Sequence, residues 1–125
     1  KKGHIINIGS IAGRQAYPNG NVYCGTKAAV HSITEGMRID LVSHGIKVTQ
    51  IAPGAVETEF SLVRLKGNAE AANAFYKGYK PLSAKDIADI TFYTTTLPEH
   101  VCINDILVTP TAQANVYVYH KELFS

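Results

Sequence analysis

The stretch SIAGRQAYPNGNVYCGTK, residues 10–27, decides the fold of this chain. It places Ser10 thirteen residues before Tyr23, and Tyr23 four residues before Lys27. Four residues is slightly more than one helical turn, so Tyr23 and Lys27 share a face if they lie on a helix. An ammonium beside a phenol favours the phenolate, whereas an isolated tyrosine titrates near pH ~10. With Ser10 as a neutral hydrogen-bond donor, the three side chains suit proton transfer at an alcohol or carbonyl oxygen.

The alternative interpretation of this motif is a surface tyrosine covered by the stem of a lysine, which is common in proteins. The flanking sequence favours the chemical interpretation. The apolar segment HIINIGS, residues 4–10, precedes the motif, and a long helical pattern follows it. The motif therefore sits in a strand, a loop and a helix, which is the local structure that it needs.

Composition limits the class of protein. The 125 residues are 46% hydrophobic and 18% charged, with a net charge of +2 and no block of like charges, which is typical of one globular domain and argues against a nucleic-acid partner. No apolar run reaches the ~18 residues of a membrane span, and the first residues lack a signal peptide. Cys24 and Cys102 form no disulfide framework, which indicates a cytoplasmic protein. The five histidines lack HxxxH spacing, so we expect no metal site.

The predicted elements follow the order strand, helix, strand, insertion, helix, strand. The segments predicted as strands are 4–9, 46–52 and 103–109, and those predicted as helices are 21–43 and 84–96. This order predicts a parallel sheet with helices on both faces, a doubly wound α/β fold. Ligands of such sheets bind beyond the carboxyl ends of the strands, where Ser10 and Pro53 are expected.

Residues 55–81 form a polar insertion after the second strand. We predict a lid over the site, with short helices at 59–65 and 69–79. The sequence SAKD, residues 83–86, resembles a capping box at the start of the following helix. In that helix, Ile87, Ile90 and either Phe92 or Tyr93 are expected to face the core.

The long helix has two distinct faces. Asn21 is a possible cap at its start. Its predicted core face carries residues at helical spacing: Val30, Ile33, Met37 and Leu41. Its other face carries small residues, Ala29, Ser32 and Gly36, which suit the close approach of a helix from a second subunit. We therefore expect a homodimer or homotetramer.

Three pieces of the chain resemble the short-chain dehydrogenase/reductase family. They are NIGS at 7–10, YCGTK at 23–27 and PGAVET at 53–58, and together they have the spacing of the family. The resemblance covers nearly the whole chain but only the C-terminal half of the fold of the family, a Rossmann-like domain. The segments NGNVYCGTKAAV, PGAVETEFSLVRLKG and INDILVTPTAQAN further resemble NADP-dependent 3-hydroxy acid dehydrogenases, which oxidise serine and L-allo-threonine.

The resemblance implies a role for each residue of the motif. Tyr23 is implied as the general acid/base. Lys27 would favour its phenolate and bind the nicotinamide ribose, and Ser10 would orient the substrate oxygen. Residues of the second strand end would lie along the nicotinamide: Pro53, Gly54, Val56 and Thr58. The Val56 backbone and the Thr58 hydroxyl would contact its carboxamide, although Thr58 can also cap the insertion's first helix.

The chain contains no glycine-rich GxxxGxG loop. The phosphate loop, the cofactor-selecting residue and the catalytic asparagine of the family would lie upstream of Lys1. We therefore expect residues 1–125 to be the C-terminal half of one Rossmann-like domain, inactive alone. The preference for NADP over NAD rests only on the resemblance to the 3-hydroxy acid dehydrogenases.

The sequence leaves two classes of function open. The first is an oxidoreductase that moves a hydride between a nicotinamide cofactor and a small 3-hydroxy acid, or another alcohol or carbonyl compound. The second is a non-catalytic oligomerisation module of the same fold. For a substrate carboxylate, the expected partner is Arg64, because a guanidinium can donate two hydrogen bonds. Arg14 and Lys66 are alternatives, and Arg64 can also be a solvated charge on the insertion.

Overall fold

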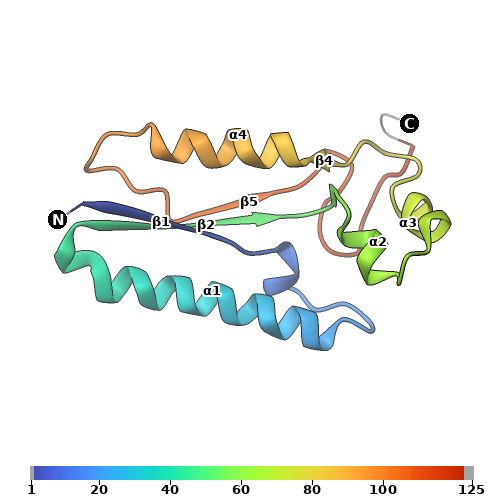
Figure 1. Ribbon diagram of the computed structural model, residues 1–125, viewed down its shortest axis with the longest axis horizontal. Helices are drawn as coiled ribbons and strands as arrows, with labels where there is room; N and C mark the ends of the chain where they lie inside the picture. The colour runs from blue at the N-terminus through green and yellow to red at the C-terminus, as the bar shows by residue number, and fades with distance from the viewer. Residues whose placement is uncertain (1, 123–125) are drawn as a thin grey trace.

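Three parallel strands form the centre of the molecule. The computed structural model describes residues 2–122 (Figure 1). Strands β1 (Gly3–Ile8), β2 (Ile46–Pro53) and β5 (Asp105–Val108) form a sheet in the order β1-β2-β5. The middle strand is buried from Val48 onward, as its continuous apolar run predicts.

The register brings the carboxyl ends of β1 and β2 together. Ile5 lies opposite Val48, and Ile8 lies opposite Ile51. Beyond the last pair, the backbone nitrogen of Gly9 donates to the Ile51 carbonyl at 2.7 Å. The residues that follow the two strands therefore emerge side by side, at the edge where the sequence predicts the site.

Two helices cover opposite faces of the sheet. Helix α1 (Asn21–Leu41) lies against one face and helix α4 (Ala84–Thr95) against the other (Figure 1). A short 3-10 turn, η2 (Val42–His44), continues α1 to the point where the sequence predicts its end. The predicted doubly wound α/β arrangement is confirmed.

The two helices begin in different ways. At α4 the predicted capping box is confirmed, because the hydroxyl of Ser83 accepts from the Asp86 nitrogen and the Asp86 carboxylate accepts from the Ser83 nitrogen. At α1 the prediction of Asn21 as the cap is wrong. Gly20 holds the cap position, and Asn21 is the first helical residue. A side chain at Gly20 would collide with the ring of Tyr17, so close packing requires glycine there.

The predicted core faces of both helices are wrong in part, and for the same reason. On α1, Ile33 is 59% exposed and its neighbour Thr34 is buried. On α4, Phe92 and Tyr93 are exposed, and Thr94 is buried instead. Each buried threonine donates its hydroxyl to a carbonyl of its own helix, at 2.6 Å and 2.7 Å, which offsets the cost of burying it. Apolar periodicity cannot identify such a residue.

The remaining predicted core residues of these helices are partly buried. On α1 they are Val30, Met37 and Leu41, and on α4 they are Ile87 and Ile90.

The insertion contains two short helices and a small sheet. Its elements are β3 (Val56–Glu57), α2 (Phe60–Arg64), α3 (Ala69–Phe75) and β4 (Leu82–Ser83). Both helices are shorter than predicted. The pairing of β3 with β4, parallel to each other, was not predicted; it closes the base of the insertion.

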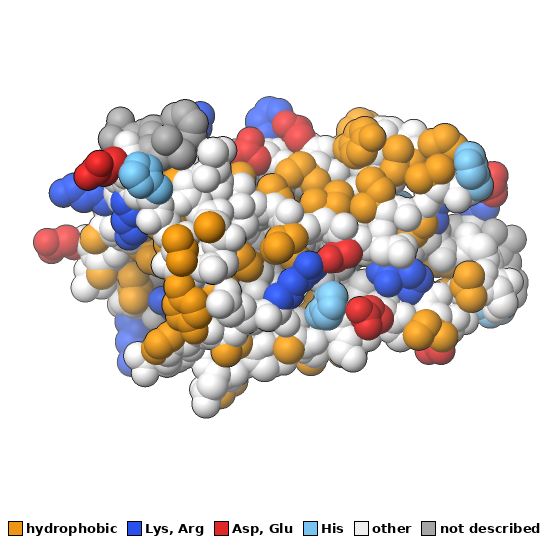
Figure 2. Space-filling view, turned by 180° about the vertical axis from the view of Figure 1, so that it is seen from behind, with side chains coloured by type: hydrophobic (Ala, Val, Ile, Leu, Met, Phe, Trp, Pro, Cys, Tyr) orange, Lys and Arg blue, Asp and Glu red, His pale blue; other side chains and the backbone are white. Residues whose placement is uncertain are grey.

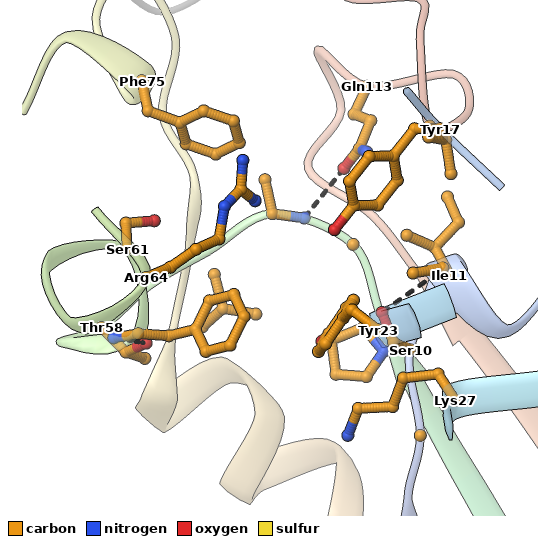
Figure 3. A pocket seen from close by; sticks show the side chains of 18 of the residues that line it. Ser10, Ile11, Tyr17, Tyr23, Lys27, Thr58, Ser61, Arg64, Phe75 and Gln113 are labelled. Atoms are coloured by element: carbon orange, nitrogen blue, oxygen red, sulfur yellow. Dashed lines mark hydrogen bonds between the residues drawn. The ribbon is translucent and has the colours of Figure 1, made fainter. Parts of the chain in front are cut away.

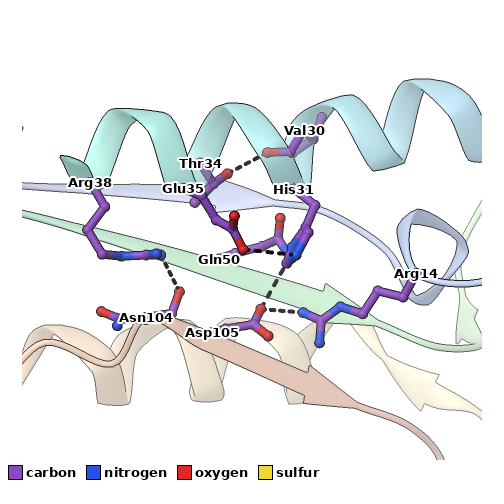
Figure 4. A network of polar contacts seen from close by, with 9 residues as sticks. All are labelled: Arg14, Val30, His31, Thr34, Glu35, Arg38, Gln50, Asn104 and Asp105. Atoms are coloured by element: carbon purple, nitrogen blue, oxygen red, sulfur yellow. Dashed lines mark hydrogen bonds and ion pairs between the residues drawn. The ribbon is translucent and has the colours of Figure 1, made fainter. Parts of the chain in front are cut away.

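A polar network joins α1 to the sheet on the side shown in Figure 4. Arg14 forms an ion pair with Asp105 of β5. The buried Gln50 donates to the same carboxylate at 3.2 Å and lies 3.0 Å from Nδ1 of His31. Arg38 donates to the Val48 carbonyl at 3.1 Å and to the Asn104 carbonyl at 2.8 Å. Figure 2 shows this face as a central band of charged and histidine side chains below a hydrophobic group over α4.

Residues 110–120, here named the strap, follow β5 and fold back on themselves. The nitrogen of Ala114 donates to the Val118 carbonyl at 2.9 Å, and that of His120 donates to the Ala112 carbonyl at 2.8 Å. Ala112 packs with Ala55 and Tyr79 in a hydrophobic cluster. The strap is thereby fixed to the insertion and to the end of β2. None of the helices formed by residues 2–122 has the length and apolar character needed to cross a membrane.

Candidate active site

A cavity of about 400 Å³ lies beyond the carboxyl ends of β1 and β2 (Figure 3). Every residue predicted for the site lines it: Ser10, Tyr23, Lys27, Pro53, Gly54, Val56, Thr58 and Arg64. They come from the β1–α1 connection, α1, the end of β2 and the insertion. The fold thus brings together residues that are up to 54 positions apart in the sequence (64 − 10).

Ser10 follows β1 and begins a 3-10 turn, η1 (Ile11–Gly13). Its Oγ accepts a hydrogen bond from the Ala12 nitrogen at 3.0 Å. This bond uses a lone pair of the oxygen and leaves the hydroxyl hydrogen to donate elsewhere. Ser10 is therefore held as a donor at the wall of the cavity.

Tyr23 and Lys27 lie on successive turns of α1 and on the same face. Nζ of Lys27 is 5.8 Å from the centroid of the Tyr23 ring. The turn that carries Ser10 packs directly on this part of the helix, since a Cβ on Gly13 would lie 2.6 Å from the Lys27 carbonyl oxygen. Glycine at position 13 therefore sets the distance between the serine loop and the helix that bears Tyr23.

The end of β2 supplies the backbone side of the cavity. The Val56 carbonyl accepts from the Tyr76 hydroxyl at 2.9 Å, and this hydroxyl lies 2.8 Å from Oγ of Ser61. The hydroxyl of Thr58 accepts from the Phe60 nitrogen at 3.2 Å, at the start of α2. Glu59, and not Thr58, holds the cap position of α2, so the alternative in which Thr58 caps this helix is wrong. The Thr58 hydroxyl keeps its hydrogen for a ligand.

Among the three cations considered for a substrate carboxylate, the structure places only Arg64 at the cavity. Arg14 is paired with Asp105, and neither Arg14 nor Lys66 lines the cavity. The guanidinium carbon of Arg64 lies 5.9 Å from the ring centroid of Tyr17 and 6.0 Å from that of Phe75. Within residues 2–122 the Arg64 guanidinium has no hydrogen-bond or ion-pair partner. Its five N–H donors are therefore available to an anion.

Several lining residues were not predicted from the sequence. Gln113 of the strap accepts from the Ala55 nitrogen at 2.9 Å and donates to the Asn115 carbonyl at 3.1 Å. Val116 and Tyr117 also line the cavity. No local pattern marks these strap residues, because the sequence alone does not show that they return to this edge of the sheet. Tyr17 was within reach of prediction, since it lies in the stretch between Ser10 and Tyr23.

The lining residues fit the nicotinamide end of a dinucleotide. The Lys27 ammonium has no hydrogen-bond partner within residues 2–122, and the Thr58 hydroxyl keeps its hydrogen. These donors suit a ribose and a carboxamide. The sequence offers no glycine-rich loop for the phosphates. Within residues 2–122, no group of three His, Cys, Asp or Glu side chains is placed to hold a metal ion.

Comparison with known proteins gives a consistent set of similarities. The family model for short chain dehydrogenase matches residues 1–67, more than half of the 125 residues. Sulfoacetaldehyde reductase 2 of Chromohalobacter salexigens is 48% identical over 88% of this chain and 44% of its own length. The NADP-dependent 3-hydroxy acid dehydrogenase of Schizosaccharomyces pombe is 43% identical over 97% of this chain and 47% of its own length.

A solved structure is also similar. It is the closed form of a serine dehydrogenase complexed with NADP+, with a TM-score of 0.86 and 42% identity over 94% of this chain and 48% of that chain. This chain therefore spans about half the length of the relatives that it matches. The matched family model, the parallel fold and the arrangement of Ser10, Tyr23 and Lys27 lead to one conclusion: the chain belongs to the short-chain dehydrogenase family.

Proposed function

We propose that the protein carrying this chain is an NADP-dependent dehydrogenase that oxidises the hydroxyl group of a small 3-hydroxy acid, such as serine or L-allo-threonine. One observation carries the proposal: the cavity has Ser10, Tyr23 and Lys27 on one side and the unpaired cation of Arg64 on another. The similar 3-hydroxy acid dehydrogenase and the serine dehydrogenase bound to NADP+ support this choice of substrate and cofactor.

The proposed roles follow from the geometry of the three side chains. The Ser10 hydroxyl donates a hydrogen bond to the substrate oxygen, because its hydrogen is not used by the bond that Oγ accepts from Ala12. Tyr23 is the acid/base that takes the proton from the substrate hydroxyl, and Lys27 acts beside it, with Nζ 5.8 Å from the centroid of the Tyr23 ring. Bound NADP would supply the acceptor for the hydride that leaves the carbinol carbon. In the reverse direction Tyr23 returns the proton to the oxygen.

Arg64 is the proposed partner of the substrate carboxylate. A desolvated carboxylate needs charged or multiple donors, and a guanidinium can provide two parallel hydrogen bonds. Arg64 lies at the end of α2, in the insertion that we propose acts as a lid. Substrate binding would then link the insertion to the floor of the cavity.

A second candidate substrate is a small sulfonate aldehyde. Sulfoacetaldehyde reductase 2 is 48% identical to this chain, and an arginine can donate to sulfonate oxygens as it does to a carboxylate. The same cavity would then work in the direction of reduction, with Tyr23 as the proton donor. Both candidates share a short chain with an anionic end.

The test is a comparison of substrates with the whole protein that carries this sequence. We expect NADP reduction with serine and L-allo-threonine, or NADPH oxidation with sulfoacetaldehyde, and much weaker turnover of neutral alcohols of the same size. Arg64→Ala should lower kcat/KM for the anionic substrate by roughly 30–150-fold, the value of one charge-assisted contact of ~2–3 kcal/mol. The control is Lys66→Ala, because Lys66 is a cation of the same insertion but lies outside the cavity lining. This substitution should change kcat/KM for the anionic substrate little. Equal losses on charged and neutral substrates would contradict the role of Arg64.

Assembly and location are part of the same proposal. The outer face of α1 carries Ala29, Ser32 and Gly36, and a Cβ on Gly36 would meet no atom within 4 Å outside its own helix. We propose that this face packs against another subunit in a homodimer or homotetramer. The two free cysteines, Cys24 and Cys102, support a location in the reducing cytoplasm.

A further inference from the structure

Tyr17 occupies a fixed position at the wall of the cavity. Its ring lies against Gly20, where any side chain would collide with it, and the guanidinium carbon of Arg64 is 5.9 Å from the ring centroid. The first contact holds the ring to the start of α1, and the second holds it to the end of α2. Tyr17 therefore joins the β1–α1 loop to the insertion, beside the cation proposed to bind the substrate.

The hydroxyl of Tyr17 is free within the described part of the chain, residues 2–122. Figure 3 shows it pointing into the space between Arg64 and the Ser10–Tyr23 side of the cavity. Two other tyrosines of the lining have committed hydroxyls. Tyr76 donates to the Val56 carbonyl, and Tyr117 donates to the Ala16 carbonyl. The hydroxyl of Tyr17 therefore differs from those of Tyr76 and Tyr117 because it has no hydrogen-bond partner in the described part of the chain.

We propose that Tyr17 is a substrate-binding residue whose hydroxyl donates a hydrogen bond to the same anionic group that Arg64 binds. This inference rests on the proposed function. A carboxylate or sulfonate has more lone pairs than one bidentate arginine can satisfy, so a second neutral donor removes part of the desolvation cost. Tyr17 suits this role chemically. Burial raises the pKa of Tyr17, with Arg64 opposing the rise, so the hydroxyl keeps its proton at neutral pH.

The two donors also explain which end of the substrate goes where. The hydroxyl or carbonyl end must reach Ser10 and Tyr23, and the anionic end is then held by Arg64 and Tyr17 across the cavity. The rings of Tyr17 and Phe75 flank the guanidinium. At these distances the two rings can make cation–π contacts with the guanidinium, which favour its position at the cavity.

The experiment compares Tyr17→Phe with the control Tyr93→Phe, at an exposed tyrosine of α4 outside the cavity lining, in the whole protein. The substrate is whichever of serine or sulfoacetaldehyde the parent enzyme turns over. Tyr17→Phe keeps the ring over Gly20 and beside Arg64, and it removes only the hydroxyl. We expect KM for the anionic substrate to rise by about 10-fold or more, because a hydrogen bond to a charged group is lost. The kcat value, the KM for NADP and the turnover of a neutral alcohol should change by less than about twofold. Tyr93→Phe should leave the KM for the anionic substrate near the parental value.

The outcomes separate this inference from the proposed function. A parent enzyme with no preference for anionic substrates overturns both. If the parent prefers anionic substrates but Tyr17→Phe leaves their KM unchanged, only the role of Tyr17 is overturned. The same holds if Tyr17→Phe impairs turnover of the neutral alcohol as much as turnover of the anionic substrate. A matching rise of KM in Tyr93→Phe would show that the effect does not depend on the position of Tyr17 in the cavity and would also overturn its role. Thermal unfolding of both variants checks that the fold is intact.

Discussion

Single hydroxyl groups carry most of the proposed chemistry, and their surroundings decide what each can do. Ser10 accepts one hydrogen bond from the Ala12 nitrogen, and its hydroxyl hydrogen remains available to the site. Tyr23 has a ring held between Lys27 and Phe60, with 5.5 Å between the two aromatic centroids. This placement agrees with the proposal that Tyr23 exchanges the proton and that Ser10 donates a hydrogen bond without giving up its own proton.

Replacing Tyr23 with phenylalanine tests this division directly. Tyr23→Phe keeps the packing against Phe60 but removes the proton-transfer group, so turnover should fall by ~10²–10⁴-fold. Binding of NADP, measured by fluorescence titration, should stay within a few-fold of the parent. A variant that retains more than about a tenth of the parental turnover would show that Tyr23 is not the acid/base.

His4 gives the stability a dependence on pH at the other end of the sheet. Thr49 donates its hydroxyl to the Ile103 carbonyl at 2.7 Å, so it must accept from Nε2 of His4, 2.7 Å away. Burial, and then the charge of Lys47, lower the pKa of His4 below its usual 6.5. Below about pH 6.5 the unfolded chain then binds more protons than the folded chain, so stability falls as the pH drops through this range.

We therefore expect the thermal unfolding midpoint to decrease between pH 7 and pH 5, and to decrease less in His4→Gln. The glutamine can still donate to Thr49 but does not titrate. The measurement is a series of melting curves of both proteins over this range. Parallel decreases in the two proteins would assign the effect to other groups.

At the scale of elements, the strap is the part of the cavity wall that comes last in the sequence. Gln113 joins it to the end of β2 through the Ala55 nitrogen, and both groups are buried. The strap also reaches the β1–α1 connection, where the Val116 nitrogen donates to Oε1 of Gln15 at 3.3 Å. One wall of the cavity therefore depends on a few hydrogen bonds rather than on a helix or strand.

Gln113→Leu should destabilise the protein by ~1–3 kcal/mol, because it leaves the buried Ala55 nitrogen without an acceptor. Gln15→Leu removes a longer and less buried hydrogen bond to the same strap, so it should lower the free energy of unfolding by less. Urea unfolding of the two variants gives the comparison. Equal costs, or none for Gln113→Leu, would show that the strap is held by the hydrophobic cluster around Tyr79 instead.

The elements also show what a sequence can and cannot predict. The three strands and the two long helices could be predicted because apolar runs and helical periodicity are local signals. The same periodicity favoured Ile33 and Phe92 over Thr34 and Thr94, because it cannot register a hydroxyl that is satisfied within its own helix. The strands β3 and β4 have two residues each, too few to produce a pattern.

At the scale of the whole molecule, the same contrast applies to the site. Ser10, Tyr23, Lys27 and the residues after β2 could be predicted to meet because parallel strands end at one edge. The strap wall could not, since a contact such as Gln15 with Val116 spans 101 residues. The structure brings the predicted residues to one cavity, and their chemical roles remain predictions.

The outer face of α1 leads to a prediction about assembly. Val22 and Ile33, which are 76% and 59% exposed, share this face with Ala29 and Gly36. We expect sedimentation velocity at micromolar concentration to show a dimer or tetramer of the whole protein. Gly36→Leu should weaken it, because a large side chain would keep the paired helices apart. Lys77→Leu, which adds the same side chain to an exposed position of the insertion, is the control. A monomeric parent would contradict the assembly.

The strap also bears on how the protein is made. Its contacts with Gln15 and Ala16 join residues 101 positions apart. A ribosome adds roughly 5–20 residues per second, so on the order of 5–20 s separate the synthesis of the serine loop from that of its covering wall. These two contacts, and the cavity wall that depends on them, can therefore be completed only after the strap has left the ribosomal tunnel.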